Sequence, residues 1–517
     1  MPDPSYAAAL SFLSSLISTD PCAIRASNAN RTNTVEEMTE YCRRAGLADL
    51  INGDYTGGQD YTGGQAYTGG QAGDCAVTDC AVTPPKASSP SPPSLPSPPS
   101  PPSPPPLLVY HVTGTKGKGS TCCFLESLLR TAHGRRTVLF TSPHLASPRE
   151  RIRIDGRPVT ERLFARAHAD LLESLRASHA ELPPDDPHKH LPPTPSYFKY
   201  LSLLCLSLLA SLPPSPTALV LEVGMGGRHD ATNVFLSPTA ACVATLDLDH
   251  TRVLGGTLEL IAGEKGGVYK RGSAKFSAAQ DPGALRVLGE CAAGVGGGVV
   301  VVPPLEGYEL GLKGDFQRGN AALALAMSRV GAGEAGEGEE REALGGARWP
   351  GRCQEEEREG NVYCLDGAHT DLSVELAQGW FKDRCAAHPT LRKVLLFNCS
   401  HERSPVSLLG RLGGGWDEVI FARANTERPS SERKKGAGEL LREAGLEFAG
   451  GEGGEASWQE TLGKVWAGLH GEDGGGVTVA GSVKEALERV QGGGAIVFCT
   501  GSLYIVGSLL EELGVVS

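Results

Sequence analysis

Residues 111–121, HVTGTKGKGST, place three glycines and two lysines directly after an apolar run, a combination that could bind phosphate. Glycines at 114, 117 and 119 would let the backbone approach an anion closely, and Lys118 could reach the outer phosphate oxygens of a nucleotide. A plain glycine-rich turn is the alternative. The usual phosphate loop carries Ser or Thr directly after its lysine to bind Mg²⁺. Here Gly119 stands in that place, so a metal-binding hydroxyl must come from Ser120 or from elsewhere.

An acid and a histidine follow two later apolar runs. Glu222 ends the run that precedes GMGGRHDATN, and His250 lies in DLDHT, after another run. A carboxylate at the buried end of a strand needs a partner, and a metal ion is a good one. The simpler alternatives are that Glu222 caps the following turn and that His250 is a hydrogen-bonded loop histidine. Their position near the phosphate loop, at the ends of predicted parallel strands, favours a metal site.

The second half of the chain offers three further candidates. Arg352 lies in RWPGRCQ, while Asp366 and His369 flank a tight glycine turn in LDGAHT. A guanidinium group can pair with phosphate through two parallel hydrogen bonds. Taken singly, each of the three residues is more simply explained as a turn residue or a surface charge.

The elements that must position these residues alternate along the chain. Strands are predicted at Leu108–Val112, Thr137–Thr141, Ala218–Val223, Ala241–Leu246, Val362–Leu365, Lys393–Phe397, Glu418–Phe421 and Ala495–Phe498. Helical patterns separate these runs, and this alternation predicts parallel α/β sheets in two successive domains. Helical spacing in Ala7–Ile17 and Val35–Ala45 predicts further helices near the start. The glycine- and glutamate-rich stretch Gly331–Gly346 is interpreted as a hinge.

One segment has a composition unlike the rest. Residues 52–106 contain three copies of a YTGGQ unit and a stretch that is nearly all Ser and Pro. Such a composition cannot bury enough apolar surface to offset chain entropy, so disorder or a polyproline-II spacer is expected. We favour a tolerated loop insertion over a docking site for an aromatic-grooved domain.

Overall composition limits the class of protein. The chain has 517 residues, of which 40% are hydrophobic and 21% charged, which is typical of a soluble protein with two or three domains. A net charge of −12 argues against nucleic-acid binding, because phosphate backbones require a basic surface. No run approaches the roughly 18 apolar residues that span a bilayer, and the start lacks the features of a signal or transit peptide.

Taken together, the motifs resemble the Mur ligase superfamily and, within it, the folylpolyglutamate synthases of eukaryotic type. In chain order they are VTGTKGKGST, TSPHL, RERIRIDG, YFKYLSLL, LEVGMGGRHDATN, DHTRVLGGTLELIAGEKGGVYK, GDFQRGNAALALA, RWPGRCQ, YCLDGAHT, LLFNCS and CTGSLYIVG. The resemblance implies a P-loop ATPase domain with a parallel sheet at 107–343 and a smaller Rossmann-like α/β domain at 344–517. Residues 1–51 would be a helical part of the first domain.

The resemblance also implies roles for individual residues. The ATP phosphates would be held by Gly117, Lys118, Gly119 and Ser120, with Gln317 and Asn320 on the adenine side and Arg352 and Asp366 reaching ATP from the second domain. The Mg²⁺ ligands would be Ser142, Glu222 and His250, Ser142 supplying the hydroxyl that is missing after Lys118. We expect Lys118, Lys265 and His369 to act in catalysis. The lysine equivalent to Lys265 is carbamylated in some members and helps to hold a second metal ion.

The implied reaction is ATP-dependent. ATP would phosphorylate the γ-carboxylate of the terminal glutamate of a folate, and the amine of L-glutamate would attack the acyl phosphate to give an amide, ADP and phosphate. The expected partners are tetrahydrofolate polyglutamates, L-glutamate and ATP with Mg²⁺, and a monovalent cation such as K⁺ is left open. We expect a monomer in the cytoplasm, with a mitochondrial isoform as the alternative.

Two other activities compete with this interpretation. Dihydrofolate synthase, alone or in a bifunctional enzyme, is the closest rival, although YFKYL and EKGGV favour folylpolyglutamate synthase. A P-loop ATPase without ligase activity is a more distant one, and the DGAH and WPGR motifs of the second domain argue against it.

Overall fold

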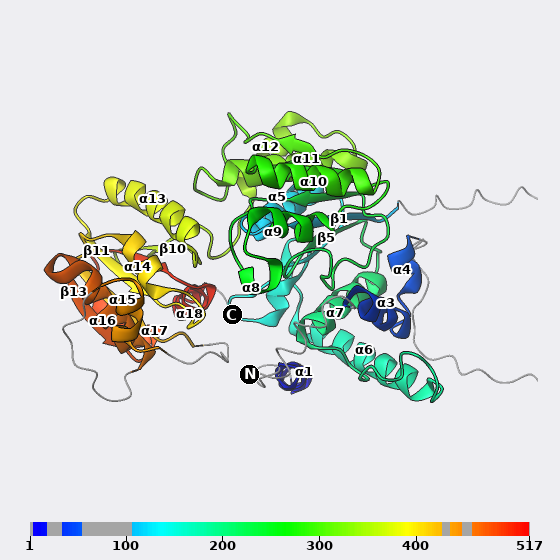
Figure 1. Ribbon diagram of the computed structural model, residues 1–517, viewed down its shortest axis with the longest axis horizontal. Coiled ribbons are helices and arrows are strands. Elements are labelled where there is room, and N and C mark those ends of the chain that lie inside the picture. Colours follow the sequence, from blue (N-terminus) through cyan, green and yellow to red (C-terminus); the bar gives the residue numbers. More distant parts are fainter. Residues whose placement is uncertain (1–3, 18–33, 54–105, 426–434, 447–456, 516–517) are drawn as a thin grey trace, which may run out of the picture.

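The computed structural model of the chain describes residues 4–17, 34–53, 106–425, 435–446 and 457–515 (Figure 1). Two α/β bodies lie side by side, and a group of helices flanks the first of them. That helical group comprises α1 (Pro4–Ser15), α3 (Thr34–Arg44), α4 (Ala48–Asn52), α6 (Glu161–Glu181) and α7 (Tyr197–Ser211). No helix in these ranges is long and apolar enough to cross a membrane.

The first body is built on an eight-stranded sheet with the order β4-β3-β2-β5-β1-β6-β7-β8. Its strands are β1 (Leu108–Thr113), β2 (Thr137–Phe140), β3 (Ile152–Ile154), β4 (Arg157–Pro158), β5 (Ala218–Glu222), β6 (Ala240–Val243), β7 (Ala274–Ala278) and β8 (Val300–Val302). Strands β2, β5, β1, β6, β7 and β8 pair in parallel, whereas β3 and β4 add an antiparallel edge. The four strands β2, β5, β1 and β6 are adjacent, so the segments that follow them leave the same edge of the sheet.

Helices cover both faces of this sheet because each central strand is apolar on both sides. In β1, Val109 packs in the cluster that includes α6 and α7, while Tyr110 and Val112 pack in the opposite cluster with α5 and α11. The helices around the sheet are α5 (Lys118–Ser127), η2 (Leu128–Ala132), η3 (Pro148–Arg151), α8 (Thr251–Leu254), α9 (Leu258–Gly266), α10 (Pro282–Gly294), α11 (Gln317–Ala332) and α12 (Glu337–Gly346).

The second body has a six-stranded sheet with the order β13-β12-β11-β14-β10-β9. Its elements are β9 (Gln354–Arg358), β10 (Asn361–Leu365), α13 (Asp371–Ala387), β11 (Arg392–Phe397), α14 (Pro405–Leu412), β12 (Glu418–Ala422), α15 (Ala437–Glu443), α16 (Trp458–His470), η4 (Gly471–Gly474), β13 (Gly476–Ala480), α17 (Val483–Val490), β14 (Ala495–Thr500) and α18 (Leu503–Glu512). All neighbouring strands are parallel except β9, which pairs antiparallel with β10. Helices α13 to α16 cover one face, and α17 and α18 cover the other.

The predicted fold class is confirmed, since the chain folds as mixed α/β with parallel sheets and each predicted strand is present, although β6 ends at Val243. The predicted hinge at Gly331–Gly346 is wrong, because most of that stretch forms helix α12. Glu340 in α12 is 1% exposed and pairs with Arg329 at 2.6 Å, and Leu344 packs in the core of the first body. The predicted insertion at 52–106 lies almost entirely outside the described residues.

Candidate active site

The glycine-rich segment links β1 to α5 at the edge of the first sheet. Gly117 adopts a left-handed backbone with φ of 80° directly before the first residue of α5. A Cβ at Gly114 would lie 2.8 Å from the Cβ of Ala244, so this position needs glycine as well. Because α5 begins at Lys118, the free N–H groups of its first turn and the Lys118 side chain both lie at this loop. The Lys118 ammonium donates to the Thr115 carbonyl at 3.3 Å.

Two buried amides of α11 support this loop from behind. A Cβ at Gly117 would lie 2.1 Å from Oδ1 of Asn320, so the loop and this amide are in direct contact. Nδ2 of Asn320 donates to Oε1 of Gln317 at 2.8 Å. Gln317 is fully buried, and its Nε2 has no partner in the described parts of the chain. A buried donor without a partner is costly, so this amide fits a ligand that carries a hydrogen-bond acceptor, such as a purine ring.

Glu222 lies at the end of β5, beside the segment that follows β2. Its side chain is 4% exposed, and Oε2 accepts a hydrogen bond of 3.0 Å from the N–H of Ser142. Burial raises the pKa of Glu222 above its ordinary value, although Lys118, Arg352 and Arg151 are near enough to oppose this. A carboxylate buried with so few hydrogen bonds fits a bound cation, and Mg²⁺ is commonly held by one carboxylate together with substrate phosphates.

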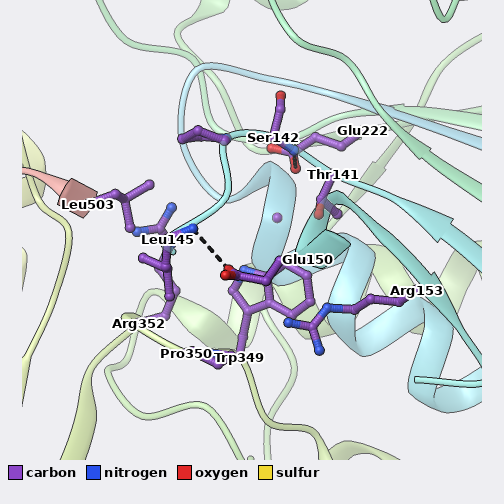
Figure 2. Close-up of a pocket in the computed structure, with 12 residues that line it drawn as sticks. Thr141, Ser142, Leu145, Glu150, Arg153, Glu222, Trp349, Pro350, Arg352 and Leu503 are labelled. Carbon is purple, nitrogen blue, oxygen red and sulfur yellow. Dashed lines mark hydrogen bonds between the residues drawn. The ribbon is translucent and has the colours of Figure 1, made fainter. Parts of the chain in front are cut away.

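A small cavity of about 30 Å³ opens next to this carboxylate (Figure 2). The lining residues are Gly119, Thr141, Ser142, Pro143, Leu145, Glu150, Arg153 and Glu222 from the first body, with Trp349, Pro350, Arg352 and Leu503 from the segment after α12 and from the second body. Figure 2 shows Ser142 and Glu222 together on one side, and Leu145, Leu503 and Arg352 together on another. The cavity therefore lies at the junction of the two bodies.

The second body presents Arg352 and Asp366 at this junction. Asp366 follows β10, and Arg352 precedes β9, which pairs antiparallel with β10, so both lie at the same end of the second sheet. Oδ2 of Asp366 accepts the backbone N–H of Cys353 at 2.9 Å and its thiol at 3.5 Å. Burial raises the pKa of Asp366, against the influence of the neighbouring Arg352 guanidinium. The two predicted residues thus lie together.

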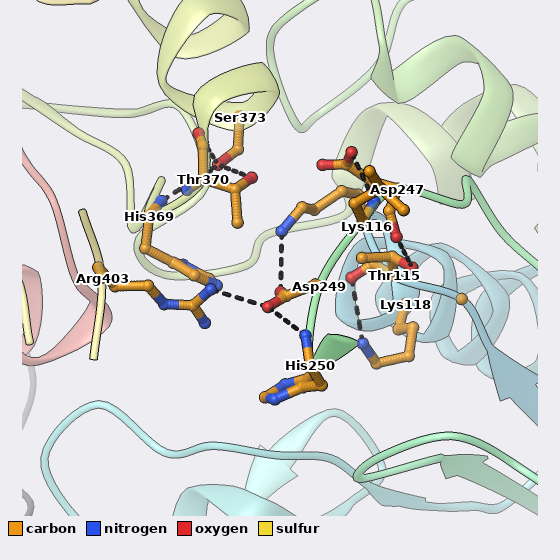
Figure 3. A network of polar contacts seen from close by, with 12 residues as sticks. Thr115, Lys116, Lys118, Asp247, Asp249, His250, His369, Thr370, Ser373 and Arg403 are labelled. Atoms are coloured by element: carbon orange, nitrogen blue, oxygen red, sulfur yellow. Dashed lines mark hydrogen bonds and ion pairs between the residues drawn. The ribbon is translucent and has the colours of Figure 1, made fainter. Parts of the chain in front are cut away.

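A charged cluster joins the two bodies beside the phosphate loop (Figure 3). Asp249 accepts from Arg403 of the second body at 2.8 Å and pairs with Lys116 of the loop at 3.3 Å. Burial alone would raise the pKa of Asp249, but Lys116 and Arg403 hold it well below its usual range. Sequence reasoning missed Asp249 and Arg403 as site residues. The available signal was that Asp249 precedes His250 and that Arg403 follows the LLFNCS motif.

The two predicted histidines border the same cluster. The backbone N–H of His250 donates to Asp249 at 2.9 Å, and His250 has a left-handed backbone with φ of 51°. Nδ1 of His369 donates to the Gly367 carbonyl at 2.7 Å. Burial, with Lys116 and Arg403 nearby, lowers the pKa of His369 to about 3, so its imidazole is neutral near pH 7.

The structure brings only part of the predicted metal set together. Ser142 and Glu222 share a hydrogen bond and the cavity, whereas His250 does not line it. Among the described residues, no group of three or more His, Cys, Asp or Glu side chains has an arrangement that could hold a metal ion. A site completed by phosphate oxygens and water is compatible with this arrangement.

Lys265 of α9 lies beneath the phosphate loop. It is 3% exposed, and its Nζ donates to the Gly114 carbonyl at 2.8 Å. Burial and the nearby Lys118 lower the pKa of Lys265 far below its ordinary value. A lowered pKa favours the neutral amine, which is the form that reacts with CO₂.

The chain matches no model of a protein family. It is 37% identical over 369 residues to the human protein named folylpolyglutamate synthase, mitochondrial, a match that covers 63% of this chain and 60% of the human protein. It is 34% identical over 436 residues to the folylpolyglutamate synthase of Saccharomyces cerevisiae strain YJM789, covering 78% of this chain and 77% of the yeast protein.

Solved structures with the same fold include three bacterial proteins, two of which contain ADP. The Mycobacterium tuberculosis folylpolyglutamate synthase complexed with ADP has a TM-score of 0.64 at 23% identity, covering 79% of this chain and 90% of that one. The Thermotoga maritima folylpolyglutamate synthase has a TM-score of 0.61 at 24% identity, covering 79% and 89%. Escherichia coli FolC in complex with DHPP and ADP has a TM-score of 0.60 at 24% identity, covering 79% and 88%.

Proposed function

The chain belongs to the folylpolyglutamate synthase family and is an ATP-dependent ligase, and from this premise we propose how its residues divide the reaction. The substrates would be a folate with a glutamate tail, L-glutamate and ATP. The γ-carboxylate of the last glutamate is a poor electrophile until its oxygen is phosphorylated. The amine of the incoming glutamate then displaces phosphate, which forms the amide bond and leaves ADP and phosphate as the other products.

The first body would hold the nucleotide. The N–H groups of the loop and of the α5 N-terminus bind the phosphates, and Lys118 exchanges its contact with Thr115 for a phosphate oxygen. Glu222 and Ser142 would hold Mg²⁺. His250, which follows β6 on the other side of β1, would be the third ligand. When bound, this ion supplies positive charge that offsets the charge on the phosphate being transferred. Gln317, with its free Nε2, would receive the adenine ring.

The second body would complete the site from the opposite side. Arg352 reaches the cavity beside Glu222, and Asp366, held by Cys353, lies near enough to attract its guanidinium. His369, with a pKa of about 3 and therefore neutral near pH 7, would offer a hydrogen-bond acceptor to the incoming amine rather than take up its proton. Because both bodies line one small cavity, their contact excludes water from an acyl phosphate that would otherwise hydrolyse.

One observation supports this proposal above the others. Glu222, a buried carboxylate with a single hydrogen bond from Ser142, shares a cavity with the phosphate-loop residue Gly119 and with Arg352 of the other body. An arginine delivered by a second α/β sheet would complete the site only when the two bodies meet, which is what a ligase that must protect an activated carboxyl group requires.

The experiment is a product assay with the purified protein. Tetrahydrofolate monoglutamate, L-glutamate and Mg-ATP should yield folates lengthened by one or more glutamyl residues, resolved by mass spectrometry, with one ADP formed for each residue added. A parallel reaction offers dihydropteroate. Product from dihydropteroate alone would assign dihydrofolate synthase instead, and ADP release that does not depend on glutamate would assign an ATPase.

We propose that the protein acts in the cytoplasm, with a mitochondrial form as the alternative, and that it works as a monomer. The human relative carries the word mitochondrial in its name, which supports that alternative for this chain. Fractionation of cells that express the full chain, with light scattering of the purified protein, tests both statements.

A further inference from the structure

The loop between β2 and β3 reaches from the proposed metal site into the core of the second body. It starts at Thr141 and Ser142, beside Glu222. Three residues further on, Leu145 is 7% exposed and belongs to the apolar cluster of the second body, together with Leu503 and Val506 of α18. Figure 2 shows Leu145 beside Leu503 at the edge of the cavity. One short loop therefore touches both the carboxylate and the neighbouring body.

Helix α18 accepts this loop through a glycine. A Cβ at Gly507 would lie 2.6 Å from the carbonyl oxygen of Leu145 and 2.9 Å from its carbonyl carbon. Both contacts are with backbone, which cannot rotate away as a flexible side chain could. Gly507 thus allows a backbone approach that no other residue permits. The sequence motif CTGSLYIVG ends at this glycine, and the proposed reaction gives the motif no other role.

The loop is stiff enough to transmit a displacement. The Glu150 carboxylate accepts the backbone N–H groups of Leu145 at 2.9 Å, Ala146 at 2.9 Å and Ser147 at 2.6 Å. The same carboxylate lines the cavity. On the other side of Leu145, its Cδ2 lies 3.5 Å from the point where a Cβ of Gly351 would be, next to Arg352. Movement of Leu145 would therefore shift Ser142 and Arg352 relative to each other.

We propose that Leu145 and Gly507 form a docking joint that sets the position of Ser142 and Glu222 relative to Arg352, and so act as positioning residues for the ligase reaction. This inference rests on the proposed function. Leu145 fills the apolar site on α18, and Gly507 allows the loop backbone to seat. Because the loop is held by the Glu150 carboxylate, the position of Leu145 also fixes the position of Ser142 beside Glu222. Ordinary interface packing is the competing explanation, and it predicts lost stability without a specific loss of turnover.

The main test compares Gly507→Ala with Gly379→Ala. Gly379 lies in α13 of the same body, and a Cβ there would meet nothing within 4 Å. Alanine favours a helix more than glycine does, so neither variant should lower Tm through helix propensity. We expect Gly507→Ala to lose kcat for glutamate addition by about 100-fold, the scale of an ångström-sized misplacement, while the Kd of ADP stays near wild type. Gly379→Ala should keep the wild-type kcat. A folded Gly507→Ala protein with wild-type kcat would overturn the proposal.

Leu145 provides a second, independent test, which also covers the case in which Gly507→Ala fails to fold. Leu145→Ala should lower kcat, and Leu145→Met, which keeps the volume, should restore most of it. If both residues act through one joint, the kcat of the double variant should resemble that of Gly507→Ala alone. Effects that multiply, or equal loss of kcat in Leu145→Met and Leu145→Ala, would count against the joint.

Amide hydrogen exchange measures the stability of the docked loop independently of catalysis. In Gly507→Ala the amides of Leu145, Ala146 and Ser147 should lose protection, because the loop can no longer seat, whereas those of α13 should not change. Unchanged protection of the loop would contradict the proposal. If Gly507→Ala showed these exchange differences from the wild type but the wild-type protein added no glutamate, the proposed function would fail and the joint would stand.

Discussion

The two sheets contribute to the site in different ways. In the first body, Lys118, Ser142, Glu222 and His250 each follow or end one of four adjacent parallel strands, so the sheet itself brings them to one edge. In the second body, long side chains, chiefly Arg352 and Arg403, cross to the first body and depend on how the two bodies dock. In the proposed function the first body is thus the receptor for the nucleotide, and the second body is a partner whose alignment would determine turnover.

This difference predicts that removal of Lys118 has the largest effect. Lys118→Ala should leave the fold intact, since the one hydrogen bond of the ammonium to a described residue is to the Thr115 carbonyl, yet lower kcat by about 100- to 1,000-fold. Circular dichroism checks the fold, and the product assay measures the rate. Near-normal turnover in a folded variant would show that this loop does not bind the phosphates of ATP, and it would contradict the proposal that the first body holds the nucleotide.

Lys265 tests whether the receptor contains a modified residue. We expect its buried amine, whose pKa is lowered by burial and by Lys118, to take up CO₂ as a carbamate, an oxygen ligand suited to a hard cation. Lys265→Ala should then lose about 100-fold in rate, and a short carboxylate such as acetate should partly restore it. Depletion of bicarbonate should also slow the wild-type enzyme. If the intact protein had an unmodified mass and its rate did not depend on bicarbonate, the carbamate would be excluded. Lys265 would then act only as a hydrogen-bond donor to the Gly114 carbonyl.

The Asp249–Arg403 pair tests the alignment role of the second body. Arg403→Gln and Asp249→Asn should each lower kcat/KM by about tenfold, equivalent to about 1.4 kcal/mol. Because the two side chains contact each other, the double variant should lose less than the product of the single losses. Arg411→Gln is the matched control, since Arg411 forms more exposed ion pairs within the second body. Multiplicative losses would mean that the two residues act separately.

The smallest expected effect is a pH dependence of the cation site. Burial raises the pKa of Glu222 above its ordinary value of 4.5, so protons compete with a cation at a higher pH than for an exposed glutamate. The Mg²⁺ concentration for half-maximal activity should rise as the pH falls from about 7.5 to about 5.5, because the proton then occupies the carboxylate more often. Residual activity of Glu222→Gln should lack this dependence. A constant Mg²⁺ requirement in the wild type would place the cation elsewhere.

Sequence patterns predicted the strands, which depend on neighbouring residues in the chain, and missed the contacts between residues that are far apart in the chain. Apolar runs identified the strands that precede or contain Lys118, Ser142, Glu222, His250 and Asp366, because buried parallel strands are continuously hydrophobic and polar side chains follow them. The polar strand β9, which Arg352 precedes, was not predicted. The Gly331–Gly346 stretch was mistaken for a hinge because its glycines and glutamates are typical of an exposed linker. The composition does not indicate that Glu340 pairs with Arg329 or that Leu344 is buried. Asp249–Arg403 and Leu145–Gly507 join residues more than a hundred positions apart, and no periodicity encodes such contacts.

The strand order β2-β5-β1-β6 also has a consequence for synthesis of the chain. The phosphate loop emerges with β1, but both neighbours of β1 are made much later, and His250 follows Lys118 by roughly 130 residues. At translation rates of about 5 to 20 residues per second, the loop waits on the order of ten seconds beside a ribosome before its sheet can close. A nascent chain should therefore gain affinity for nucleotide late and abruptly, once β6 has left the exit tunnel, rather than gradually as the loop appears.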